Sequence, residues 1–168
     1  IGLGFAKRLI LQGEGTLLLR SVVSLVDQLR AIGLQVESNN GFLPVVIEGE
    51  ITNTALSVNA SDSSQFLSGL LIVLSQKSFD CVVKVTALSS KPYIDLTLDV
   101  LSDFGVSIRH EDYSTFYING NQTMSPKKMI IEGDWSGAAN HLVGAAISGE
   151  ITMKGLSIIS TQADKSIL

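Results

Sequence analysis

The sequence predicts an α+β fold built from a repeated unit in which strands and helices follow each other in a fixed order. Strand-like alternation of apolar and polar residues recurs between stretches whose apolar residues fall at helical spacing. A shift of 72 residues places Gly33 on Gly105 and Asp62 on Asp134, and the surrounding elements come in the same order in both copies. Such a fixed period indicates a duplicated supersecondary unit. Hydrophobic residues make up 45% of the chain and charged residues 17%, which argues against disorder.

The first copy consists of a helix, two strands joined by a turn, a third strand and a second helix, which we expect over residues 20–32, 34–37, 43–48, 55–59 and 62–75. Gly33 ends the first helix as a C-terminal cap, and Asp62 begins the second helix as its N-cap. The second copy repeats this order over residues 90–104, 106–109, 115–118 and 128–132, followed by a helix that Asp134 caps.

Composition and charge exclude several kinds of partner. The net charge is −4 and no long basic run is present, so we expect neither a nucleic acid nor a membrane as partner. No apolar stretch approaches a membrane span and the first residues do not resemble a signal peptide, so we expect a cytoplasmic protein. Cys81, the single cysteine, excludes an internal disulfide and is expected to pack in a strand over 81–85. His110 and His141 lack a second ligand at metal spacing, so we expect no metal site.

Ser63, Ser64 and Gln65 lie where a strand gives way to a helix. In the first turn of a helix, free backbone N–H groups and the positive end of the helix dipole favour a phosphate or carboxylate. The serine hydroxyls can donate to such an anion, and the Gln65 amide can donate to and accept from a hydroxyl group. The alternative is an ordinary helix N-cap with polar neighbours.

Ser90, Lys91 and Tyr93 form a second run at the start of a helix, where Pro92 suits the first helical position. Ser90 can donate to a phosphate, and Tyr93 can pack on or hydrogen-bond a ligand. The alternative for Tyr93 is a half-buried aromatic residue with a solvated hydroxyl. Lys91 adds positive charge near this helix start, or is a solvated residue of the cap.

These two runs resemble the Ser-Ser-Gln and Ser-Lys-Pro-Tyr runs of the 5-enolpyruvylshikimate-3-phosphate (EPSP) synthase family. Three further matches follow in the family's order: Arg20 ahead of Leu-Val-Asp-Gln-Leu-Arg over 25–30, Glu-Gly-Asp-Trp-Ser-Gly-Ala over 132–138, and Ser-Thr-Gln-Ala-Asp over 160–164. Each match alone is weak, but five in order over nearly the whole chain are a specific signal.

The resemblance implies βαβαββ units, three to a globular domain, arranged as an inside-out α/β barrel with the helices bundled inside and the sheets outside. We accordingly divide the chain into a remnant of a first unit (1–19), two repeat units (20–88 and 89–156) and a crossover into a second domain (157–168). On this interpretation the chain is a piece of a larger, monomeric enzyme.

The resemblance also implies a reaction of the shikimate pathway, by which aromatic amino acids are made. The enolpyruvyl group of phosphoenolpyruvate passes to the 5-hydroxyl of shikimate 3-phosphate, and phosphate is released without a metal or organic cofactor. The residues implied to bind shikimate 3-phosphate are Ser63, Ser64, Gln65, Ser90 and Tyr93. No catalytic residue is assigned, because the family's Leu-Pro-Gly-Ser-Lys-Ser run is absent and its catalytic aspartate is expected in the second domain. We therefore expect the chain to be inactive alone.

Arg20 and Arg8 are the candidates for phosphoenolpyruvate. The forked guanidinium of Arg20 can grip a phosphate or carboxylate, and a cation at a helix N-terminus is unfavourable without an anion partner. Arg8 closes a match over Gly4, Ala6 and Arg8 to a family run that opens a helix near the phosphoenolpyruvate site, with Phe5 in place of the usual hydroxyl residue.

Two other interpretations remain open. The related UDP-N-acetylglucosamine enolpyruvyl transferase shares the repeat and the phosphoenolpyruvate chemistry, but it lacks the two serine-containing runs at these places. A repeat domain of this kind could also be non-catalytic and bind a phosphorylated ligand or a protein partner. Phosphate release by the full-length protein distinguishes an enzyme from such a binding domain.

Overall fold

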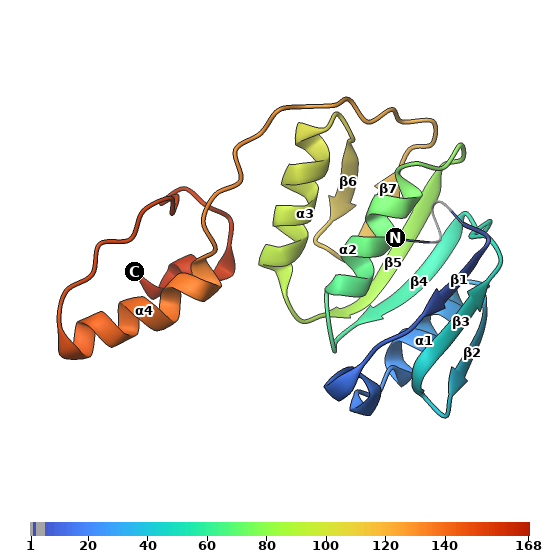
Figure 1. Ribbon diagram of the computed structural model, residues 1–168. Coiled ribbons are helices and arrows are strands. Elements are labelled where there is room, and N and C mark those ends of the chain that lie inside the picture. Colours follow the sequence, from blue (N-terminus) through green and yellow to red (C-terminus); the bar gives the residue numbers. More distant parts are fainter. Residues whose placement is uncertain (1, 3–5) are drawn as a thin grey trace.

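A computed structural model describes residue 2 and residues 6–168 of the chain, so Gly4 and Phe5 lie outside the described residues. Its elements, in chain order, are β1 (Arg8–Leu11), η2 (a 3-10 helix, Gly15–Leu19), α1 (Val23–Ala31), β2 (Gln35–Asn39), β3 (Phe42–Glu48), β4 (Ala55–Ala60), α2 (Gln65–Leu74), β5 (Cys81–Leu88), α3 (Lys91–Asp103), β6 (Ile108–Glu111), β7 (Thr115–Ile118), α4 (Trp135–Ser148) and η3 (a 3-10 helix, Ala163–Ile167). Helices occur between two sheets that are mainly antiparallel, and several strands follow one another directly in the chain, which confirms the α+β class (Figure 1).

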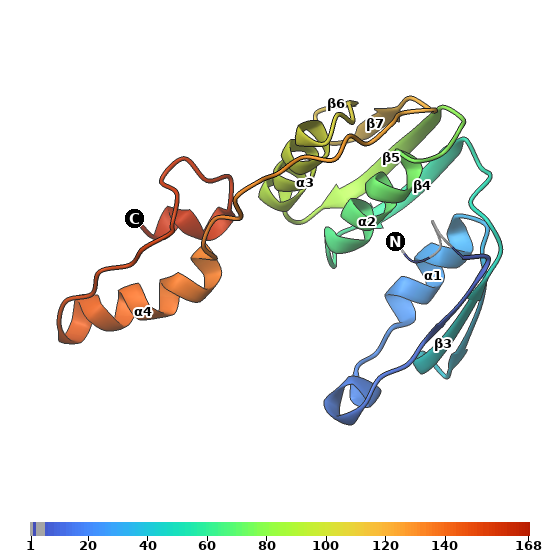
Figure 2. The same ribbon diagram turned by 45° about the horizontal axis from the view of Figure 1, so that its top comes forward.

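The first sheet has three antiparallel strands in the order β1-β3-β2, and α1 covers one of its faces (Figure 2). Side chains alternate between the two faces of a strand, and the buried Val45 and Ile47 of β3 alternate with more exposed neighbours. Val26 and Leu29 are the buried residues of α1 and belong to the same apolar core.

The second sheet has four strands in the order β4-β5-β7-β6. β4 and β5 are parallel, whereas the other pairs are antiparallel. In β4, the buried Leu56, Val58 and Ala60 alternate with exposed residues, as expected for a half-buried strand. Both α2 and α3 lie on one face of this sheet (Figure 2). Since β4 leads into α2 and β5 into α3, both helices begin beyond the carboxyl ends of neighbouring parallel strands.

One apolar core joins the two sheets through their helices. It includes Leu67 and Leu71 of α2, Ile94 of α3 and Phe116 of β7, all of which are fully buried. The helices therefore lie on the shared inner side, with the sheets outside them, as the family resemblance implied. Among the described residues the two sheets remain open and form no closed barrel.

The repeat predicted from the 72-residue shift recurs in the ends of α1 and α3. Gly33 and Gly105 have φ angles of 96° and 87°, a region that only glycine adopts without strain. Leu34 N–H donates to Leu29 C=O and Val106 N–H to Leu101 C=O, at 3.1 and 2.9 Å. Each is the hydrogen bond of a Schellman motif, which ends a helix on a left-handed glycine. Both copies therefore turn into their next strand in the same way.

The C-terminal unit, residues 130–168, lies apart from both sheets at the end of an extended segment (Figures 1 and 2). Asp134 caps α4, as predicted, by accepting hydrogen bonds from Ser136 and Gly137 N–H. Trp135 and Ala138 are the buried residues of α4, and η3 packs against this helix.

Four expectations about secondary structure are wrong. The helix expected over 20–32 begins at Val23, and Arg20 is the C-cap residue of η2 instead of the first residue of that helix. The strand expected over 128–132 is not formed, because the described residues offer it no partner strand there, and Ile130 is 96% exposed. α2 begins at Gln65, with Ser64 rather than Asp62 in the N-cap position. Arg8 does not follow a helix opening but begins β1, where it pairs with Glu48 of β3. The predicted domain boundaries stay a prediction.

Candidate functional site

The start of α2 brings Ser63, Ser64 and Gln65 together. Ser64 occupies the N-cap position and is only 5% exposed, and its carbonyl accepts the Ser68 N–H at 3.0 Å. Ser63 Oγ accepts the Gln65 N–H at 3.1 Å, so this hydroxyl satisfies one N–H at the helix start and keeps its own proton free to donate. The Ser64 side chain makes no capping hydrogen bond. Ser63 therefore has a capping role, whereas capping does not account for Ser64.

A cavity of about 590 Å³ lies between α1 and α2, beside this helix start. Most of its wall is apolar, and its polar lining side chains come from α1, from the segment just before it and from the start of α2. They are Ser21, Ser24, Gln28, Asp62, Ser63 and Gln65. Apolar pockets with a few polar groups at one end are the usual form of small-molecule sites.

Ser90 and Tyr93 lie at the start of α3. Ser90 is the N-cap residue, and the Tyr93 side chain is exposed enough to reach a ligand, at 45%. Pro92 stands at the first helical turn, as predicted. The Lys91 ammonium lies 5.0 Å from the centre of the Tyr113 ring, a cation–π contact that directs this charge toward the β6–β7 turn.

The two helix starts are held next to each other by the end of β4. Ser89 donates both its N–H and its hydroxyl to the Ala60 carbonyl, each at 3.2 Å. The pairing of β4 with β5 shifts by one residue just there, and Ala87 adopts a φ of 58°. A non-glycine residue with positive φ is uncommon and often marks a functional site. Ser90 therefore directly follows a residue that is bonded to the end of β4, three residues before Ser63.

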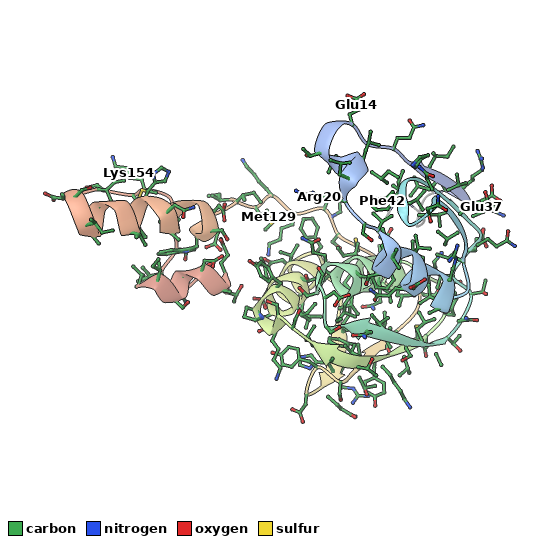
Figure 3. All side chains as sticks on the ribbon, turned by 90° about the horizontal axis from the view of Figure 1, so that it is seen from below. Glu14, Arg20, Glu37, Phe42, Met129 and Lys154 are labelled. Atoms are coloured by element: carbon green, nitrogen blue, oxygen red, sulfur yellow. The ribbon has the colours of Figure 1, made fainter. Side chains whose placement is uncertain are left out.

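The two candidate arginines are placed differently. Figure 3 shows Arg20 on the segment between η2 and α1, next in the chain to the cavity-lining Ser21. Arg8 Nε donates to Glu48 Oε1 at 2.6 Å. Leu9 and Leu11 line the cavity, and Arg8 alternates with them along β1, so its side chain points to the opposite face. The structure brings Arg20 near the cavity and does not bring Arg8 there.

A polar cluster joins the start of α4 to the segment before η3. Glu132 Oε1 accepts hydrogen bonds from the Ser160 hydroxyl and from Gln162 Nε2, and these two bonds hold the pKa of the Glu132 carboxyl below its usual value. Gln162 Oε1 in turn accepts the Trp135 N–H at 2.8 Å. Because Glu132 is stabilised in its ionised, hydrogen-bonded form, it suits a structural role better than that of a proton-transfer base.

Ser68 and Thr97 were not singled out from the sequence, although both lie close to the candidate runs. Their hydroxyl oxygens are 2.8 Å apart across the contact of α2 with α3. The available signal was spacing: Ser68 lies four residues after Ser64 and Thr97 four residues after Tyr93, on the same helix faces.

The described residues contain no group of histidine, cysteine, aspartate and glutamate side chains that could hold a metal ion. None of the helices in the described part of the chain is long and apolar enough to cross a membrane.

Comparison with known proteins decides the family. The family profile of EPSP synthase (3-phosphoshikimate 1-carboxyvinyltransferase) matches residues 2–168. The chain belongs to the EPSP synthase family. The 3-phosphoshikimate 1-carboxyvinyltransferase of Tolumonas auensis is 38% identical over 159 residues, which are 92% of this chain and 37% of that protein. Those of Actinobacillus pleuropneumoniae and Haemophilus influenzae are 37% and 36% identical over 93% and 95% of this chain.

A solved EPSP synthase from Acinetobacter baumannii has the same fold, with a TM-score of 0.70 at 23% identity over 96% of this chain and 36% of that one. The family predicted from five short runs is thereby confirmed, and the relatives carry the name of the phosphoshikimate transferase rather than that of the related UDP-N-acetylglucosamine transferase. The chain spans about 37% of the length of the curated relatives it matches.

Proposed function

We propose that this chain carries the shikimate 3-phosphate half of the site of an EPSP synthase. In the full-length protein, the enolpyruvyl group of phosphoenolpyruvate passes to the 5-hydroxyl of shikimate 3-phosphate, and phosphate leaves. The observation that supports this most is the adjacency of two hydroxyl-rich helix starts, at the carboxyl ends of the parallel strands β4 and β5. Ligands of open α/β sheets bind at that edge, and helix N-termini there favour anions.

The roles we assign follow from the chemistry of each group. Ser63, Ser64 and Ser90 donate to the 3-phosphate, together with backbone N–H groups in the first turns of α2 and α3. Gln65 can donate to and accept from a ring hydroxyl at once. Tyr93 packs on the shikimate ring or hydrogen-bonds it. We keep Lys91 as a source of positive potential near the phosphate, because its ammonium lies against the Tyr113 ring rather than against a carboxylate.

Phosphoenolpyruvate is assigned to Arg20 first and Arg8 second. None of the ion pairs found among the described residues includes Arg20, whereas Arg8 is paired with Glu48. Binding an anion at Arg8 would therefore require the exchange of an existing carboxylate partner. A guanidinium fork fits the planar carboxylate and the phosphate of phosphoenolpyruvate equally well.

The reaction needs a base for the 5-hydroxyl and an acid for the methylene carbon of phosphoenolpyruvate, on the way through a tetrahedral intermediate. We assign neither to this chain, which we propose to be inactive alone. Both are expected in the part of the full-length protein that lies outside it. The family further suggests a monomeric, cytoplasmic enzyme without metal or organic cofactor.

The test is calorimetric titration of the chain with shikimate 3-phosphate and, separately, with shikimate. We expect weak binding that requires the 3-phosphate and weakens at least tenfold in a Ser64→Ala, Gln65→Ala double variant, because two polar contacts are lost. The matched control is Ser75→Ala, Gln76→Ala, the same residue pair at the opposite end of α2, where both side chains donate only to Ile72 C=O. This control should bind as the unmodified chain does.

Phosphate release by the full-length protein completes the test. Release that depends on both substrates and falls in the Ser64→Ala, Gln65→Ala variant supports the proposed reaction. Binding of shikimate 3-phosphate without any release would instead favour the non-catalytic alternative. A folded full-length protein that neither binds shikimate 3-phosphate nor releases phosphate would overturn the proposal.

A further inference from the structure

A chain of two hydroxyl hydrogen bonds connects α2 to the first turn of α3. Thr97 Oγ1 donates to the Tyr93 carbonyl at 2.7 Å, and the Ser68 and Thr97 hydroxyl oxygens are 2.8 Å apart. A hydroxyl has one proton, and that of Thr97 is used on Tyr93, so Ser68 must be the donor in the second bond. The order is thus Ser68 to Thr97 to the Tyr93 backbone.

This link lies one helical turn behind both candidate substrate runs. Ser68 follows Ser64 on α2, and Thr97 follows Tyr93 on α3, each by four residues. The buried α2 and α3 residues near it, Leu67, Leu71 and Ile94, are apolar. Apolar contacts are non-directional and let one helix shift along another at small cost, whereas a hydrogen bond weakens steeply with distance and angle.

We propose that Ser68 and Thr97 are positioning residues that prevent α3 from sliding along α2. They thereby fix the distance between the start of α2 (Ser63–Gln65) and the start of α3 (Ser90 and Tyr93). The inference rests on the proposed function, because it assumes that both runs hold the same shikimate 3-phosphate. Neither hydroxyl needs to touch the substrate. A ligand held at two helix starts is sensitive to their separation, and misplacement by about 1 Å can cost a large factor in rate.

Ordinary helix chemistry accounts for only one of the two bonds. Threonine hydroxyls in helices often donate to the carbonyl four residues earlier, as Thr97 does. This common hydrogen bond within a helix does not explain why the Ser68 hydroxyl, on α2, donates to Thr97. Both residues are partly buried, so Ser68 exchanges a bond to water for this bond between the helices.

The experiment uses the full-length protein and compares Ser68→Ala and Thr97→Val with the unmodified protein. We expect KM for shikimate 3-phosphate to rise about three- to tenfold in each variant, the effect of one lost hydrogen bond, with KM for phosphoenolpyruvate unchanged. The double variant should be no worse than the poorer single one, since both changes break the same link. Thr97→Ser keeps the hydroxyl and should restore the KM of the unmodified protein.

Ser75→Ala is the matched control, because it also removes a hydroxyl that donates to a carbonyl of α2, at the far end of that helix. A merely structural role for Ser68 and Thr97 would lower the melting temperature and leave both KM values unchanged, and that outcome overturns the inference. An unchanged KM for shikimate 3-phosphate in Ser68→Ala, alongside a raised KM in Ser64→Ala, would overturn this inference alone. An inactive, folded full-length protein would remove the proposed function and this inference with it.

Discussion

Tyr113 shows how a single side chain ties the second sheet to α3. It lies in the turn between β6 and β7, and it and Asp112 have φ angles of 59° and 45°. Positive φ is costly for a bulky residue, so the surrounding contacts must maintain it. The Tyr113 hydroxyl donates to Asp95 Oδ1 at 2.6 Å, and its ring stacks on His110 at 4.4 Å between centroids. The turn thereby holds Asp95, one turn into the helix that begins with Lys91.

The Tyr113–Asp95 bond makes a prediction about ionisation. The hydrogen bond to Asp95, with its negative charge, raises the pKa of the Tyr113 phenol above its usual value. Since the folded-state pKa exceeds the unfolded one, this bond contributes stability below about pH 10 and loses it as the pH rises through the folded-state pKa. Asp95→Asn should therefore lower the pKa of Tyr113 and weaken the alkaline decline in stability.

The measurement is a pH titration of ring-labelled tyrosines by NMR, with Tyr113 assigned from a Tyr113→Phe variant. Glu111→Gln is the control, because Glu111 accepts the hydroxyl of Tyr117 and raises the pKa of that residue instead. It should move the Tyr117 titration and leave that of Tyr113 in place. An Asp95→Asn protein in which Tyr113 titrates unchanged contradicts the prediction.

The two helix ends at Gly33 and Gly105 give a prediction for whole elements. Alanine at either position must adopt a left-handed φ, which costs about 1–2 kcal/mol. Steric crowding is small, because a Cβ at position 33 would meet only Asn53 Nδ2, at 3.3 Å, and a Cβ at position 105 would meet no atom closer than 3.7 Å. Gly33→Ala and Gly105→Ala should each lower the free energy of unfolding by about that amount, measured by urea titration. Asparagine tolerates this conformation better, so Gly33→Asn and Gly105→Asn should lose less. If alanine and asparagine lowered the free energy of unfolding equally, steric crowding rather than backbone strain would be the cause of the loss.

Elements whose signal is local were predictable from the sequence. The glycine caps of α1 and α3, the Asp134 cap of α4 and the alternation of β4 each depend on a few neighbouring residues. The strand expected over 128–132 failed because strand formation needs a partner, and apolar β-branched residues such as Ile130 do not reveal whether one is present.

The site was predictable in part for the same reason. The residues of the runs 63–65 and 90–93 are typical of helix starts, so these positions could be predicted. That the two starts are adjacent depends on the parallel pairing of β4 with β5, which is a contact between residues distant in the sequence. The match of Arg8 to a family run that opens a helix was misleading, because three matching residues carry no information on whether the chain is extended. The spacing places Ser68 and Thr97 on the same helix faces as Ser64 and Tyr93, but it does not show that α2 and α3 pack together there, so the bond between them could not be predicted.

At the scale of the whole molecule, the apolar core stops well before the C-terminus. The main core cluster and the side chains packed on it include no described residue after Met124. In the C-terminal unit, Trp135 and Ala138 are the buried hydrophobic residues, and Trp135 donates its backbone N–H to Gln162 Oε1 and its ring N–H to the Ser157 carbonyl. A unit with so little buried apolar area opens at lower free energy than the core.

We therefore expect unfolding in two steps. Trp135, the single tryptophan, reports on the C-terminal unit by fluorescence, while Cys81, the single cysteine, reports on the core through its reaction with a thiol reagent. Cys81 is 2% exposed, and burial raises the pKa of its thiol, so it should react only when the core opens.

In urea, the fluorescence transition of Trp135 should occur at a lower concentration than the labelling of Cys81. Glu132→Gln should shift the fluorescence transition to a still lower urea concentration and leave the labelling transition unchanged. Glu150→Gln, an exposed acid just beyond α4, should change neither. Coincident transitions in the unmodified protein would mean that the two parts unfold as one cooperative unit despite their separate cores.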